Sequence, residues 1–208
     1  MSTRKGMREA RRLRSRRIRA VLASGLVFGV GAAMTLAAWN DSEHTTANFT
    51  AGRFGIVGAT DGVAFSEHPT APGATLPFQL PATAAAMTPG ATVYALFSVR
   101  TINPSVAGSV QLKAGAGNGA GLGAHLTYSV RTITQTTCNA ANFGTGTAVA
   151  GLPVNATLVT GATSSQALTA NAGAQVNYCF EVTLPAAAPN TAQGLTLTAT
   201  WEFAATAS

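Results

Sequence analysis

Histidines and carboxylates, the side chains behind most metal and acid–base chemistry, are few and scattered in this sequence. His44, His68 and His125 stand apart, without the HExxH or i,i+4 spacing of zinc sites on helices. Asp41, Glu43 and His44 are close together, but in an extended segment both carboxylates share one face and the imidazole points to the other. We therefore predict a solvated polar turn there, with no catalytic residue, metal ligand or cofactor.

Two further patterns resemble fragments of known sites. Ser66, Glu67 and His68 are residue types of a hydrolase triad, but triad members converge from distant positions and sequence neighbours do not. The glycine-rich stretch 115–123 has Ala120 where a dinucleotide-binding loop has its third glycine, and a strand rather than a helix is expected after it. We interpret the stretch as a mobile loop and predict that the protein is not an enzyme.

Cys138 and Cys179 are the only cysteines in the chain. An even pair in an exported protein predicts a disulfide. Closing a loop of about 40 residues would stabilise the fold by roughly 4 kcal/mol in the chain-entropy model. The sequence leaves two unpaired thiols as the alternative.

The first 38 residues have the three-part layout of an export signal. Nine of the 13 Lys and Arg residues lie in positions 1–19, an apolar run covers 20–38, and small residues end it. We predict a signal peptide over 1–38, cleaved near Ala37 or Ala38, followed by a single domain over 39–208. The apolar run would span about 28 Å as a helix, so an uncleaved membrane anchor is the alternative.

The basic character of the chain belongs to this signal and not to the domain. From Trp39 onward there are four basic and six acidic residues, a net charge of −2. A nucleic-acid-binding domain needs several cations on one face to neutralise phosphates. We therefore expect no nucleic-acid partner.

The rest of the chain shows the alternation of half-buried strands between turn residues. In 92–102, Val93, Ala95, Phe97 and Val99 share one apolar face. Further strands are expected over 124–134, 174–184 and 194–203, with shorter ones over 48–57, 62–65, 74–80, 106–113 and 154–159. The pattern predicts an all-β fold, a two-sheet antiparallel sandwich that is jelly-roll-like and preceded by the signal helix.

The junction between signal and domain carries a family pattern. The pattern is an aromatic residue, then Asp or Ser-Asp, then Phe-x-(Ala/Ser)-Gly-x-(Phe/Leu), and it is matched by Trp39, Asp41, Phe49, Gly52 and Phe54. With the apolar run before it, residues 16–58 resemble the SipW-type signal peptide and mature start of the TasA/camelysin family. A thinner match over 87–103 includes a Pro-Gly turn, although Pro104 stands where the family usually has Gly. Near the C-terminus, Tyr178-Cys179 and Leu184-Pro185 are similar to the Ala-rich variants from high-GC Gram-positive bacteria.

The resemblance implies processing by a SipW-like signal peptidase, a jelly-roll sandwich, and secretion to the cell surface or biofilm matrix. Family members form fibres in which the N-terminal segment of one subunit adds as a strand to the next, through main-chain hydrogen bonds and side-chain pockets. The candidate donor-strand anchors here are Trp39, Phe49 and Phe54. The alternative is that 48–57 is the domain's own first strand.

We therefore expect a secreted or cell-surface structural protein that associates with itself into fibres or with matrix components. Its membrane contact would be limited to an uncleaved signal segment. An extracellular ligand-binding sandwich is the alternative, because a fold of this class serves many functions. A camelysin-like surface metalloprotease is less favoured, since the sequence shows no zinc ligand set.

Overall fold

The computed structural model describes residues 11–26, 42–78 and 86–208. Residues 11–26 form a helix with every side chain exposed. The cleavage region at Ala37 and Ala38, and the aromatic residue Trp39, lie outside the described residues. Within the described ranges, no helix combines the length and the apolar character needed to cross a bilayer. The folded domain spans Thr50–Ser208, and the residues before it form a separate unit.

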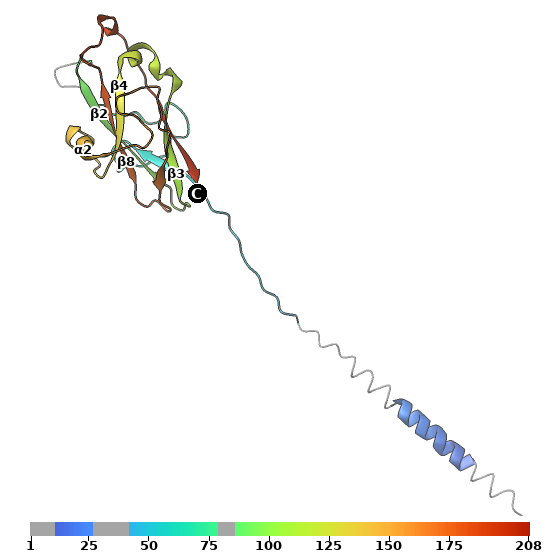
Figure 1. Ribbon diagram of the computed structural model, residues 1–208. Coiled ribbons are helices and arrows are strands. Elements are labelled where there is room, and N and C mark those ends of the chain that lie inside the picture. The colour runs from blue at the N-terminus through green and yellow to red at the C-terminus, as the bar shows by residue number, and fades with distance from the viewer. Residues whose placement is uncertain (1–10, 27–41, 79–85) are drawn as a thin grey trace, which may run out of the picture. The chain divides into compact units, whose positions relative to one another are not determined.

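The domain consists of two antiparallel sheets (Figure 1), which confirms the predicted all-β sandwich. The larger sheet has the order β1-β2-β8-β4-β5, with β6 also paired to β4, and the smaller has the order β7-β3-β9. The strands of the larger sheet are β1 Ile56–Ala59, β2 Thr92–Thr101, β8 Val176–Thr183, β4 Thr127–Ile133, β5 Thr147–Ala148 and β6 Ala156–Thr157. Those of the smaller sheet are β7 Gln166–Leu168, β3 Gly108–Ala114 and β9 Trp201–Ala207.

The core lies between the sheets and follows the predicted alternation. Val93 and Val99 of β2 face the smaller sheet, and the largest fully buried side chains are Tyr128, Tyr178 and Phe180 of the neighbouring strands. Burying a large apolar side chain contributes roughly 1.5–3 kcal/mol. This inner layer is therefore the main source of stability, and it positions β9 opposite β2 and β8.

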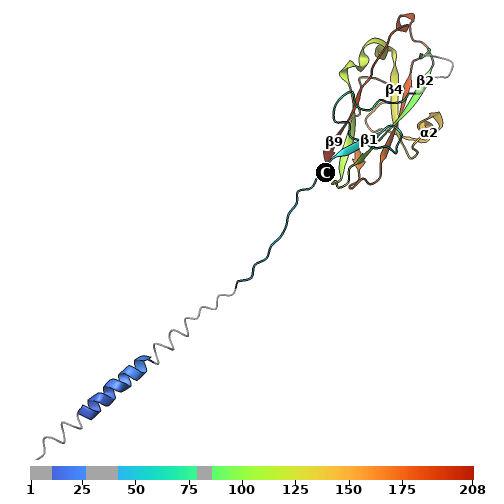
Figure 2. The same cartoon turned by 180° about the vertical axis from the view of Figure 1, so that it is seen from behind.

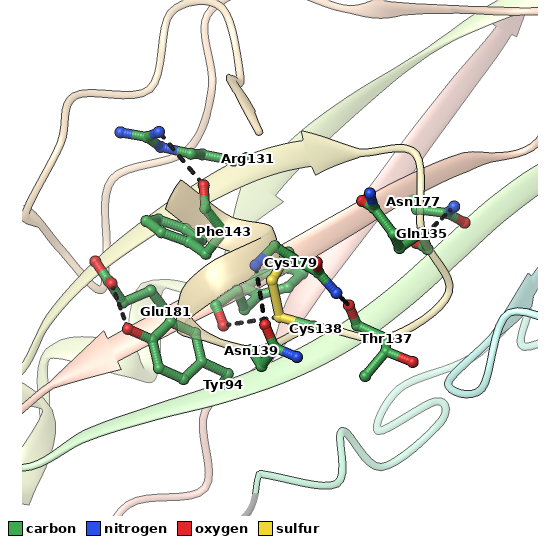
Figure 3. The surroundings of a disulfide bond; sticks show 12 residues. Tyr94, Arg131, Gln135, Thr137, Cys138, Asn139, Phe143, Asn177, Cys179 and Glu181 are labelled. Carbon is green, nitrogen blue, oxygen red and sulfur yellow. Dashed lines mark hydrogen bonds between the residues drawn. A yellow bond between two sulfur atoms is a disulfide. The ribbon is translucent and has the colours of Figure 1, made fainter. Parts of the chain in front are cut away.

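The outer face of the larger sheet is also covered. Leu96 and Cys179 point to this face and pack with Phe143 of the short helix α2 (Ala140–Thr145). The predicted disulfide between Cys138 and Cys179 is present, with the Cα atoms 5.2 Å apart, and it ties the segment before α2 to β8 (Figure 3). The side chain of Arg131 donates hydrogen bonds to three carbonyls at the end of α2, those of Phe143, Gly144 and Gly146.

Several predicted strand boundaries are wrong, for local reasons. Residues 62–65 contain no strand. Residues 62–64 are bends, because the carboxylate of Asp61 accepts hydrogen bonds from the amides of Val63 and Ala64, both at 2.8 Å. Residues 48–55 precede the first strand, which begins only at Ile56. The last strand begins at Trp201 rather than at Gly194, and the described part of 74–80 contains no strand.

The glycine-rich stretch is not a mobile loop. It forms two 3-10 helices, η1 Ala116–Gly119 and η2 Gly121–His125. Asn118 within it is 1 % exposed, and its amide donates to the carbonyls of Leu158 and Thr200 at 3.1 and 2.7 Å. The same side chain accepts from the amide of Thr200 at 2.8 Å, so the stretch orders the approach to β9.

The tyrosine side chains predict how the stability of the domain depends on pH. Burial, followed by the hydrogen bond to Glu181, raises the pKa of Tyr94 to about 12, and burial raises the pKa values of Tyr128 and Tyr178. Tyrosines of an unfolded chain ionise at about pH 10. The unfolded state therefore releases these protons first, and stability should fall as the pH rises above about 10.

A spectrophotometric titration of tyrosinate absorbance checks this expectation. The native protein should show no tyrosinate at the ordinary pKa of a phenol, and Tyr128 and Tyr178, which are fully buried, should ionise only as the protein unfolds. A tyrosine that ionises reversibly at about pH 10 in the folded protein would contradict the burial of that phenol.

Candidate functional site

An apolar groove of about 1120 Å³ is lined by residues of both sheets, some of them part of the core between the sheets. β1 and β9 both contribute residues to its lining, and both strands lie on the same side of the domain in Figure 2. Residues 67–76 and Phe78, which belong to no helix or strand, line the groove as well. The groove is therefore bordered by elements of both sheets and by an irregular segment.

The groove has an aromatic floor. The rings of Phe97 and Phe203 stack with centroids 4.8 Å apart, and Trp201 lies 5.2 Å from Phe180. Phe97, Trp201 and Phe203 are each only half-buried. Aromatic side chains dominate the energetics of interfaces when they are buried, so a floor of partly exposed rings favours an apolar occupant.

The free edge of β9 borders the same groove. The amide of Gly115 donates to the carbonyl of Thr200, and the amide of Ser208 donates to the carbonyl of Ala107, so the even-numbered residues of β9 face β3. In an antiparallel pair the backbone groups of alternate residues point to opposite edges. The amides and carbonyls of Trp201, Phe203 and Ala205 therefore point away from β3. Among the described residues, no strand pairs with this edge.

Three residues of β9 therefore offer the groove both their side chains and their backbone hydrogen-bonding groups. Trp201, Phe203 and Ala205 pack their side chains against the core, and all three line the groove. An unpaired row of backbone groups is a template for another strand. The groove can therefore bind an added strand. The edge of β9 offers hydrogen-bonding partners to the backbone of that strand, and the apolar surface accepts every second side chain of it.

Phe54, a predicted donor-strand anchor, lies in the wall of this groove within its own domain. Its ring passes 2.5 Å from the position that a Cβ atom on Gly108 would occupy, so glycine is needed there for the two to pack. The carbonyl of the preceding Arg53 accepts a hydrogen bond from the amide of Val106 at 2.9 Å. From Arg53 onward the chain is therefore part of the domain.

The segment before Arg53 has the opposite character. Residues 42–52 are exposed at every position and adopt no helix or strand, and Phe49 is 93 % exposed. In extended form, Ala47, Phe49 and Ala51 would share one face, which is apolar. The polar residues that alternate with them would share the opposite face, namely Thr46, Asn48 and Thr50. Of the two predicted anchors that the structure describes, Phe54 is packed in the domain and Phe49 is exposed.

The residues with potential chemistry do not gather. Glu43 and His44 are exposed, and Asp41 lies outside the described residues. Ser66 Oγ lies 3.2 Å from Nε2 of His68, but this is an exposed contact between near neighbours. No group of three or more His, Cys, Asp or Glu side chains that could hold a metal ion occurs in the described part of the chain.

The sequence does not predict the groove itself. The alternation of Trp201 and Phe203 correctly indicates that they share a face, but a strand pattern does not show which edge of a sheet is left unpaired. No protein-family model matches this chain, and no curated protein sequence matches it significantly. A function for the domain therefore rests on the geometry of the groove and on the residues at the predicted junction between signal and domain.

Proposed function

We propose that the protein is a structural subunit of the cell surface or extracellular matrix that assembles into fibres by strand donation. The N-terminal segment of one copy adds to the free edge of β9 in the next copy. The observation that carries the proposal is the backbone of Trp201, Phe203 and Ala205, which pairs with no strand of the described chain and lies beside an aromatic groove. The resemblance of residues 16–58 to the TasA/camelysin family points to the same function.

The exposed segment supplies a suitable donor. Its apolar face would place Phe49 over the rings of Trp201 and Phe203, while the threonines and Asn48 would face solvent. Each backbone hydrogen bond contributes about 0.5–1.5 kcal/mol net, and burial of Phe49 roughly 1.5–3 kcal/mol. Backbone pairing gives affinity along the strand, and the single large side chain fixes its register.

Export precedes assembly in this proposal. A SipW-like signal peptidase would cut near Ala37 or Ala38 and free a donor segment that begins at Trp39. The disulfide supports export, since such bonds persist in oxidising compartments outside the cytoplasm. Sequencing the N-terminus of the exported protein tests both the cleavage and its position, and an intact signal would support a membrane tether instead.

A ligand-binding module is the second candidate, and the groove is also the observation that favours it. Its volume of about 1120 Å³ slightly exceeds that of typical small-molecule pockets, at roughly 300–1000 Å³. The two functions differ in their occupant. Electron microscopy of the purified chain that begins at Trp39 should show filaments, and deletion of residues 39–51 should abolish them. Filaments that survive the deletion would overturn strand donation.

Phe49→Asp should abolish filament formation without affecting the fold. The side chain is 93 % exposed in the free protein, so the substitution costs little in the monomer. In the fibre the carboxylate would be buried against aromatic rings without a partner, which is strongly unfavourable. Thermal unfolding and electron microscopy of the same sample separate the two effects.

Val154→Asp is the matched control, because Val154 is also apolar and exposed, at 61 %, and does not line the groove. It should assemble like the unchanged protein. Equal loss of filaments in both variants would show that added negative charge, and not the loss of the anchor, prevents assembly.

A further inference from the structure

One segment of the domain lies against the groove without joining either sheet. We call residues 67–78 the strap. It begins after Ser66, whose backbone exchanges two hydrogen bonds with Gly58 of β1, each 3.0 Å long. Leu76 and Phe78 near its other end are half-buried and pack against the core cluster.

The strap covers the aromatic floor through side chains. The ring of Phe78 lies 6.4 Å from that of Trp201, in a tilted arrangement, and the ring of His68 lies 6.4 Å from that of Phe97. Trp201 and Phe97 belong to β9 and β2, so the strap touches both sheets. Trp201 is also one of the two rings that Phe49 of a second copy would meet.

The strap makes none of the backbone contacts that the groove offers. Among the bonds between described residues, the one backbone hydrogen bond of the strap joins the amide of Phe78 to the carbonyl of Leu76. The free edge of β9 stays unpaired beside it, as far as the described residues show. An incoming strand can therefore make the same apolar contacts and gain a ladder of hydrogen bonds as well, so it can replace the strap.

We propose that the strap is an autoinhibitory cover that competes with the donor segment for the aromatic floor. The inference rests on the proposed function. In the free subunit Phe78 shields Trp201, and on assembly Phe49 of the next copy takes its place. Because the cover is held by few contacts, it slows association and lowers affinity without preventing either.

The test uses a subunit that accepts a strand but cannot donate one. The chain with Phe49→Asp is titrated with a synthetic peptide of residues 42–53, with and without Phe78→Ala. Removal of the Phe78 ring should tighten peptide binding by about tenfold, the equivalent of roughly 1.4 kcal/mol of competing contact. Isothermal titration calorimetry measures the dissociation constant of the peptide for each of the two proteins.

Phe65→Ala is the matched control. Phe65 is also half-buried and lies just before the strap, but it stacks under Arg100, 3.9 Å from the guanidinium carbon, and does not line the groove. Its loss should leave peptide affinity unchanged. Equal or weaker binding after Phe78→Ala overturns the strap inference alone, whereas no binding to any of the proteins overturns strand donation as well.

Discussion

Replacing Ala205 by proline should abolish fibre assembly and leave the monomer folded. The amide of Ala205 points away from β3, so proline at this position removes a donor from the free edge and none from the sheet. Proline is tolerated on an edge strand when its nitrogen faces outward. An added strand would lose one hydrogen bond and would meet the bulk of the ring at the place where it must pair.

The neighbouring residue provides the control. Ala204 pairs with Gln111 of β3, and its amide points toward that strand. Ala204→Pro should therefore disrupt the sheet between β3 and β9, because a hydrogen-bond acceptor on Gln111 loses its donor. The expected loss of folding stability is about 1–3 kcal/mol or more. We expect Ala204→Pro to lower the unfolding midpoint and Ala205→Pro to leave it nearly unchanged.

Denaturant unfolding measures the stability of both variants, and electron microscopy shows whether they form filaments. Filaments formed by Ala205→Pro at the concentrations used for the unchanged chain would show that the fibre does not use this edge. Strong destabilisation by both substitutions would contradict the assignment of alternate residues to the two edges of β9.

The sequence determines the sandwich more fully than it determines the groove. Long alternating segments such as 92–102 form strands because each buries one face, and the structure has β2 there. The disulfide could also be predicted, since the only two cysteines of a chain that is expected to be exported have one possible pairing. Both inferences depend on local pattern or on residue type alone.

Other features depend on contacts between distant residues. Asn118 looks like a loop residue in its glycine-rich setting, but it is buried because Leu158 and Thr200 supply hydrogen-bond partners from far along the chain. The start of β9 is displaced to Trp201 because the residues before it pair with the 3-10 helices, through the amide of Leu122 and the carbonyl of Thr196. No periodicity in the sequence carries this information.

The groove depends most of all on contacts between residues that are far apart in the sequence. The acceptor role that we propose for it arises because β9 ends one sheet while its inner face carries the large side chains Trp201 and Phe203. Alternation predicts their shared face, but the open edge follows from strand order, which the sequence does not reveal. The proposed donor, by contrast, is suggested by the sequence, because Phe49 belongs to the family pattern at the signal junction.

Loss of the disulfide should cost the domain about 4 kcal/mol of stability while sparing the groove. Cys138 and Cys179 are 41 residues apart in sequence, and the chain-entropy model gives about 4 kcal/mol for a loop of that size. This is a large share of the roughly 5–15 kcal/mol that stabilises a typical domain. In addition, α2 has only six residues, too few to be stable alone, so its contact through Phe143 should loosen.

The double substitution of both cysteines by alanine, compared with the unchanged protein under a reducing agent, measures this effect by denaturant unfolding. Both samples should show the same loss. Cys179 points to the outer face of the larger sheet, whereas Tyr178 and Phe180 on either side of it point to the core behind the groove. Below its lowered unfolding temperature the variant should therefore still form filaments. Loss of filaments from a variant that remains folded would show that the outer face with α2, and not only the edge of β9, takes part in assembly.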